Sequence, residues 1–249
     1  MSIKNIKGLD LSTLKIIAFV LMIIDHFHEF FSFSDLTPQW FNYLGRLSYP
    51  IFIFALSEGL VHTSNRRRYV GRLYLSGVIM EIGNLLINSL FQRPDGLHVY
   101  NNIFYSLFLT AFIICQIEGL RQEKTKRETI LLRAAALTLP IFLIVFPPIP
   151  FLPNILSVEG GPFFIVVGLA IFYFRSTPIK RAAAYISSSL FSLAYKTLGL
   201  FSCQWMMIGA APLMLLYNGK RGVNLKYFFY IGYPLHIYLL YIASCYLIK

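Results

Sequence analysis

Long apolar runs recur along the whole of this chain, with only short polar gaps between them. A helix needs about 20 mostly apolar residues to cross a bilayer. Only 13% of the residues are charged, against about 25% in a soluble protein. We find nine apolar segments, and the gaps leave no room for a soluble domain. The segments cover approximately residues 14–31, 43–61, 69–91, 99–119, 130–146, 155–174, 182–200, 203–217 and 226–248.

This pattern predicts an all-α, polytopic integral membrane helix bundle with about nine transmembrane helices, forming a single domain over residues 1–249. The first segment has a basic start, but its far end holds charges where a cleaved signal peptide would hold small residues. We therefore expect it to be the first helix. Asp10, Ser12 and Thr13 precede or open it and are suitable N-cap residues.

The formal charge of +11 follows membrane topology rather than nucleic-acid binding. If the N-terminus is cytoplasmic and the segments alternate, 18 of the 22 Lys and Arg residues lie inside. The outside keeps Arg46, Arg93, Lys196 and Lys249. This asymmetry is what the positive-inside rule predicts, and it favours an odd number of helices. We expect a multi-pass protein of a bacterial cytoplasmic membrane, in contact with the lipid bilayer and with no nucleic acid partner.

The first segment, LKIIAFVLMIIDHFHEFF, holds Asp25, His26, His28 and Glu29 in its outer third. Ionisable side chains inside a membrane are costly and usually functional. His26 and Lys15 are eleven residues apart, so at 100° per residue both project from one face, roughly 16 Å apart along the axis. This geometry suits a long ligand with an anionic head at the cytosolic rim, such as acyl-CoA.

His26 is the candidate general base, because an imidazole titrates near neutral pH. Glu29, one turn further, or Asp25 would orient the ring. A hydrogen-bonded core histidine is the alternative interpretation of His26. Asp25 is rotated about 100° from His26 and is expected to meet another helix.

The second segment contains GRLSYPIF, and its Pro50 cannot donate to the carbonyl of Arg46. Arg46 lies at a depth similar to Asp25, so an Asp25–Arg46 ion pair is the leading interpretation. The alternative places Arg46 on a substrate anion or a developing oxyanion. Glu58, near the cytosolic end, is expected to pair with Arg72 or a neighbouring base.

Weaker candidates are spread over the remaining segments. Glu81 lies midway along the third segment, and Glu159 opens the sixth, where the helix dipole favours an acid. Gln204 opens the eighth segment, and His236 follows Pro234 in the ninth. We assign Glu58, Glu159, Gln204 and His236 as candidate substrate-binding residues. The three cysteines are widely separated, which indicates neither a zinc site nor a disulfide framework.

Several stretches together resemble the TraX family, named for a membrane protein that N-acetylates a pilin subunit. They are LKIIAFVLMIIDH, YLGRLSYPIFIFALSEGLVHTSNRRRYVGRL, the EGG of residues 159–161, and LYNGKRG followed by KYFFYIGYPLH. TraX proteins are similar to the wider transmembrane acyltransferases, in which a basic residue, ten intervening residues and a histidine mark the first helix. Lys15 and His26 have this spacing.

The resemblance implies an enzyme that transfers an acetyl or short acyl group from cytosolic acyl-CoA to an amine or hydroxyl of an extracytoplasmic peptide or glycan. His26 would be the base and Lys15 would bind near the CoA end. Arg72, Lys220 and Arg221 match motif positions on the cytosolic side and are expected to bind CoA phosphates. No metal or haem is expected.

Two other classes compete with this interpretation. In a proton-coupled transporter or lipid flippase, Asp25, His26 and Glu81 would form a proton relay. However, many transporters are built from repeated halves, and this sequence shows no repeat. A haem protein would need His26 and His236 as axial ligands on neighbouring helices.

Overall fold

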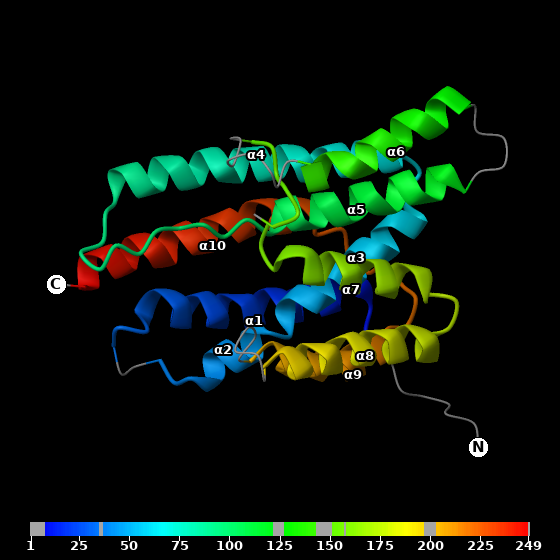
Figure 1. Cartoon of the computed structure of the whole chain (residues 1–249). Helices are drawn as coiled ribbons and strands as arrows, with labels where there is room; N and C mark the ends of the chain where they lie inside the picture. Colours follow the sequence, from blue (N-terminus) through cyan, green and yellow to red (C-terminus); the bar gives the residue numbers. More distant parts are fainter. Residues whose placement is uncertain are drawn as a thin grey trace, which may run out of the picture. The chain divides into compact units, whose positions relative to one another are not determined.

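A computed structural model describes residues 8–34, 37–121, 127–142, 151–156, 158–196 and 203–248. Its regular elements are helices (Figure 1), and the β pairing found in these residues is a single parallel bridge between Leu9 and Tyr217. The elements are α1 (Leu11–Phe31), α2 (Trp40–Gly45), α3 (Ser48–His62), α4 (Arg66–Leu90), α5 (Ile103–Leu120), α6 (Arg127–Phe142), α7 (Gly161–Tyr173), α8 (Pro178–Lys196), the 3-10 helix η2 (Gln204–Ala210), α9 (Ala211–Leu215) and α10 (Lys226–Leu247).

The all-helical prediction is confirmed, and helices occur at all nine predicted places. Within the described residues, five stretches are long and apolar enough to cross a membrane: Leu11–Phe31, Trp40–His62, Arg66–Leu90, Ile103–Leu120 and Lys226–Leu247. Helices α6, α7 and α8 and the η2–α9 pair are shorter or more polar, so nine complete crossings stay a prediction. Lys4, Lys7, Lys124, Lys126 and Lys249, which were assigned to the two sides by charge, lie outside the described residues, as does the side chain of Lys196.

The chain groups into two compact units, which are described separately. The first unit contains Met1–Ala55, Ser89–Val99 and Ala170–Lys249, and the second contains Leu56–Asn88 and Tyr100–Leu169. The predicted single domain over residues 1–249 stays a prediction. Most of the candidate site residues, including His26 and His236, belong to the first unit.

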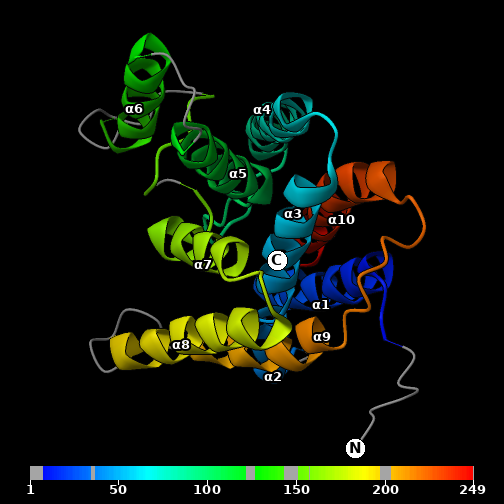
Figure 2. The same cartoon turned by 90° about the vertical axis from the view of Figure 1, so that its right-hand side faces the viewer.

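In the first unit, α1 packs against α2 and α10. The contacts between α1 and α10 run in register, from Lys15 with Phe229 to Phe30 with Tyr241, so the two helices are parallel (Figure 1). Parallel packing of the first and ninth segments is what an odd number of crossings requires. On the other side of this unit, α8 lies along η2 and α9 (Figure 2).

The start of α1 is fixed by a side-chain cap and by the loop before α10. Asp10 is the N-cap, and its carboxylate accepts a hydrogen bond of 2.8 Å from the backbone N–H of Thr13, as predicted. Ser12 donates to the carbonyls of Arg221, at 2.9 Å, and of Val223. Gly222 has a φ of +71° and passes so close to Asp10 that a side chain there would overlap the carboxylate. The LYNGKRG stretch is thereby held against the N-terminal end of α1.

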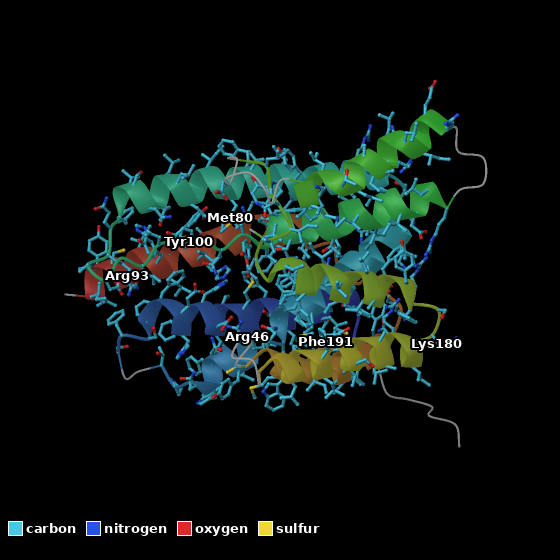
Figure 3. The ribbon with its side chains drawn as sticks, viewed as in Figure 1. Arg46, Met80, Arg93, Tyr100, Lys180 and Phe191 are labelled. Carbon is cyan, nitrogen blue, oxygen red and sulfur yellow. The ribbon has the colours of Figure 1, made fainter. Side chains whose placement is uncertain are left out.

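At the other end of α1, a buried arginine ties three segments of the first unit together. Arg93 Nη1 donates to the carbonyl of Phe30 at 2.7 Å and to Ser244 Oγ at 2.8 Å, and its other nitrogens bind the carboxylate of Asp95. Figure 3 shows Arg93 beside the C-terminal end of α10. The sequence marked Arg93 only as an outer basic residue.

Replacing Arg93 with alanine is expected to destabilise the protein by about 3 kcal/mol, because its side chain is 2% exposed and several of its partners would lose their donor. The hydrogen bond from Arg93 holds the pKa of Asp95 below its ordinary value of 3.8. The ionised Asp95 therefore stabilises the folded protein above pH 3.8, and this stabilisation is lost as the pH falls through the lowered pKa. Thermal unfolding in detergent checks the effect, with Arg68→Ala, at an exposed position, as the matched control. Equal stability of the two variants would contradict it.

The second unit is organised around α5. Tyr105, Leu109, Val158 and Ile165 form its buried apolar cluster. Gly77 of α4 lies against the ring of Tyr105 so closely that any side chain there would overlap it. The absence of a side chain therefore lets α4 approach α5, as small residues do at membrane helix interfaces.

Candidate active site

The predicted face of α1 is turned toward α10. Met22 and His26 are 4% and 3% exposed, and Phe19, at 8%, contacts the rings of Phe228 and His236 edge-on. Lys15 starts the same face, with its ammonium 5.8 Å from the ring centre of Phe229. Lys15 and His26 thus share one helix face and one partner helix, as the eleven-residue spacing predicts.

His26 and His236 are directly hydrogen-bonded. His26 Nδ1 lies 2.8 Å from His236 Nε2, and the rings are stacked with centres 5.0 Å apart. His236 Nδ1 in turn lies 2.8 Å from the backbone carbonyl of Gly232, one turn earlier in α10. Tyr233 contacts both rings and closes one side of the pair. The structure therefore brings together the two histidines that the sequence placed on separate helices.

The backbone carbonyl fixes the tautomers of both rings. A carbonyl only accepts hydrogen bonds, so Nδ1 of His236 must carry a proton. In a neutral ring the Nε2 of His236 is then an acceptor, and His26 must donate to it from Nδ1. The lone pair of neutral His26 is consequently on Nε2, which faces away from His236. A histidine oriented in this way by a second group is arranged as a general base.

Glu29 lies beside the basic nitrogen of His26. Its Oε2 is 3.9 Å from His26 Nε2, and its side chain is 38% exposed. The sequence proposed Glu29 or Asp25 as the group that orients the imidazole. In the structure the donor nitrogen Nδ1 of His26 is engaged by His236 instead, and Glu29 lies beside the other ring nitrogen, Nε2.

Asp25 and Arg46 form the predicted ion pair, with Arg46 Nη2 3.6 Å from Asp25 Oδ1. Asn42 donates to the same carboxylate oxygen at 3.4 Å. Gly45 packs directly on the Asp25 side chain, leaving no room for a larger residue. Figure 3 labels Arg46 at the end of α2, beside α1.

Arg46 is placed by a break between helices. α2 ends at Gly45 and α3 begins at Ser48, two residues before Pro50, and Ser48 Oγ donates to the Gly45 carbonyl at 2.8 Å. This break lets the Arg46 side chain turn toward α1. The charge of Arg46 lies close enough to act on both Asp25 and His26.

The basic residues of the LYNGKRG stretch lie at the same end of the unit as Lys15. The backbone carbonyl of Lys220 accepts from Leu11 N–H at 2.9 Å, and that of Arg221 accepts from Ser12. Both side chains are exposed, and Arg221 is within electrostatic range of Lys15. Three cations therefore gather at the predicted cytosolic end of α1.

The direct line from Lys15 to His26 is filled by Phe19 and Met22. Because the ring of Phe19 is packed against Phe228, Phe229 and His236, a coenzyme arm running along this face would have to pass beside it. The shared face, which the sequence suited to a long ligand, is therefore filled by side chains between Lys15 and His26.

The other candidates have neighbours of their own. Gln204 is buried in η2, with its amide 3.6 Å from Met207 Sδ. Glu58, Arg72 and Glu159 belong to the second unit. Glu58 is 3.6 Å from His62, and Arg72 is exposed over the ring of Tyr69.

Glu159 takes part in a polar cluster of the second unit. It accepts from the backbone N–H of Asn102 at 3.1 Å, and the Asn102 amide reaches Glu81 at 3.4 Å and the Gly77 carbonyl at 3.0 Å. Glu159 therefore accepts a hydrogen bond from the residue before α5, and it also lies two residues before the start of α7. The helix-dipole argument from the sequence considered only the second of these places.

Sequence reasoning missed two parts of the site. It treated His236 as a substrate contact, although the motif GYPLH holds both His236 and the carbonyl of Gly232 that fixes its proton. It also did not single out Asn42, which lies one turn before Arg46 and carried no signal beyond that spacing. Among the described residues, no cluster of three or more His, Cys, Asp or Glu side chains is arranged to hold a metal ion.

Comparison with known proteins gives a family for the chain. The family model described as TraX protein matches residues 10–244, which is nearly the full length. The chain belongs to the TraX family. This TraX-family protein is also 24% identical, over 97% of its length and 99% of the relative's, to a protein of Dichelobacter nodosus described as probable fimbrial assembly protein FimC, serogroup H1. No solved structure is significantly similar to the TraX-family chain.

Proposed function

We propose that this protein is a membrane-embedded acyltransferase of the bacterial cytoplasmic membrane, which moves an acetyl or short acyl group from cytosolic acyl-CoA to an amine or hydroxyl on the extracytoplasmic side. The observation that carries the proposal is the hydrogen-bonded chain from His26 through His236 to the Gly232 carbonyl. It directs the basic nitrogen of a buried ring, Nε2 of His26, away from His236 and toward the partly exposed carboxylate of Glu29. Membership of the TraX family and the similarity to a protein described as a fimbrial assembly protein support it.

In the proposed reaction, the acceptor O–H or N–H donates its proton to His26 Nε2 as its oxygen or nitrogen attacks the thioester carbonyl carbon. The tetrahedral intermediate carries negative charge on the former carbonyl oxygen, which Arg46 is close enough to offset. Collapse of the intermediate breaks the C–S bond. The CoA thiolate then takes the proton from His26, which returns the imidazole to its neutral form.

Throughout this cycle, His236 holds His26 in one tautomer. The proton on His26 Nδ1 stays there and is donated in a hydrogen bond to His236 Nε2, so the neutral, anchored ring of His236 stabilises the transient imidazolium. His236 is accordingly a positioning residue, and His26 is the group that touches the acceptor.

The cytosolic cations are proposed to bind the CoA phosphates. Lys15, Lys220 and Arg221 lie at one end of the first unit, about 16 Å along α1 from His26. A CoA arm spans this kind of distance between its phosphates and its thioester. Arg72 stays a prediction for the same role, in the second unit.

Lys15→Ala is expected to raise the KM for acyl-CoA about tenfold and to leave kcat within about twofold, because a cation lost from a phosphate site weakens binding without touching the reacting atoms. Lys180→Ala, which removes an exposed cation from α8, is the control. Steady-state kinetics with purified protein measures both constants. An unchanged KM in Lys15→Ala would place the nucleotide elsewhere.

The proposal as a whole is tested by incubating the purified protein with radiolabelled acetyl-CoA and envelope material from cells that lack the gene. Label appearing on protein or glycan, identified by mass spectrometry, is the expected result. Two results together would instead favour the proton-coupled transporter or lipid flippase. The first is that acetyl-CoA gives neither transfer nor thermal stabilisation, and the second is that proteoliposomes take up substrate without an acyl donor.

A further inference from the structure

The second unit contains a cavity of about 790 Å³ between α4, α5 and α6, with Leu152 and Pro153 also in its lining. It is formed by residues of this unit alone and holds none of the histidines discussed above. Its size is that of a binding site for a small molecule or a lipid chain. The cavity has a basic end and an apolar end.

The basic end is lined by Arg66, Arg67 and Arg133, with Glu118 as the acidic lining residue. Glu118 is paired with Arg121, at 3.8 Å, so its charge is already offset. Arg66 and Arg67 open α4, at the end of the helix that charge asymmetry assigns to the cytosol. The cavity therefore presents a net positive charge where the inner leaflet has its headgroups.

Arg133 is held rigidly in the wall. Its Nη1 donates to the carbonyl of Cys115 at 3.3 Å and to Gln116 Oε1 at 3.2 Å, and its guanidinium lies where any side chain at Gly119 would stand. Its Nε is buried and has no hydrogen-bond partner. Because this half-buried guanidinium is held by neutral oxygens, its positive charge remains to attract an anion in the cavity.

The apolar end extends away from these arginines. From Gly119 to Phe108, α5 lines the cavity over eleven residues, or about 16 Å, with Phe112 between them. Leu139 and Leu152 line it from other segments. Tyr74, which also lines it, directs its hydroxyl to the Phe151 carbonyl at 3.0 Å, so its polar atom is satisfied.

We propose that this cavity binds an anionic phospholipid of the inner leaflet, with the phosphate on Arg66, Arg67 and Arg133 and one acyl chain along Phe112 and Leu139. Basic pockets between transmembrane helices on the cytoplasmic side are suited to anionic lipid headgroups. The inference is independent of the proposed acyl transfer.

Charge and polarity together favour a lipid over acyl-CoA as the occupant. The pantetheine arm of CoA carries two amides, and an amide buried without hydrogen bonds is costly. Beyond the basic end, the wall offers aromatic rings, leucines and prolines rather than polar partners. An acyl chain has no hydrogen bonds to lose against such a wall, and its transfer out of water is favourable.

The test is native mass spectrometry of the full-length protein, exchanged from detergent with phosphatidylglycerol or phosphatidylcholine. We expect phosphatidylglycerol to be retained at least tenfold better. Arg67→Gln should reduce that retention about fivefold, since one cation near an anionic lipid contributes about a fivefold factor. Arg68→Gln, an equally exposed neighbour on α4 that does not line the cavity, should leave it unchanged.

Leu139→Trp provides a second probe that leaves the arginines intact, because an indole would fill the apolar end. It should reduce retention of both lipids while thermal stability is kept. Equal retention of phosphatidylglycerol in wild type, Arg67→Gln and Leu139→Trp would overturn the proposal. The proposal would also be overturned if these variants lost affinity for acyl-CoA while lipid retention stayed unchanged. That result would assign the cavity to the acyl donor.

Discussion

His26→Ala is expected to lower kcat for acyl transfer by a factor of about 10² to 10⁴, the range that a positioned general base contributes. The reason is the fixed tautomer. Only Nε2 of His26 has a lone pair directed away from His236, and without it the acceptor must lose its proton to water. The affinity for acyl-CoA should be little changed, because the cations at the other end of α1 remain. Single-turnover acetylation and calorimetric CoA binding measure the two effects.

Two further variants make the His26 result specific. His26→Gln keeps a polar side chain of similar length in this buried position and should be as inactive as the alanine variant. His28→Gln removes another histidine from α1, outside the hydrogen-bonded pair, and should retain most of the activity. If His26→Gln turns over at the wild-type rate in folded protein, His26 is not the base.

His236→Leu is expected to reduce kcat about 100-fold, the second-largest effect, with KM for acyl-CoA unchanged. Leucine occupies similar space but cannot accept the Nδ1 proton of His26, so the His26 ring is no longer held in the productive tautomer and orientation. His236→Gln offers an amide oxygen to the same proton and should recover part of the lost activity, leaving a reduction of about tenfold. Steady-state kinetics of the two variants provides the comparison.

The order of the His236 variants separates positioning from packing. A purely structural role for His236 would make both variants lose activity in proportion to their loss of thermal stability. The positioning role requires the glutamine variant to be the more active even where the leucine variant is the more stable. The reverse order of activity would show that the 2.8 Å contact does not orient the base.

Local sequence pattern determined the fold class and one face of the site. The apolar runs fixed the helices, because the bilayer demands about 20 apolar residues per crossing and hydrogen bonding within each segment. The face from Lys15 to His26 followed from the 3.6-residue repeat alone. Residue type suggested three N-caps for α1, namely Asp10, Ser12 and Thr13, and the structure selects Asp10. The helices at the fifth and eighth places were less predictable, because their apolar windows are shorter than a full crossing.

The sequence by itself therefore determined the features that depend on residues within one helix. These are the helical segments, the asymmetry of their flanking charges, and the alignment of Lys15 with His26 on α1. Only the tertiary structure decided which helix meets that face. The hydrogen bond between His26 and His236 joins residues 210 positions apart in the sequence. The hydrogen bond between Arg93 and Ser244 joins residues 151 positions apart. Such pairs follow from the parallel packing of α1 and α10, which no local periodicity encodes. The same packing placed Phe19 between Lys15 and His26, on the face that the sequence suited to a long ligand.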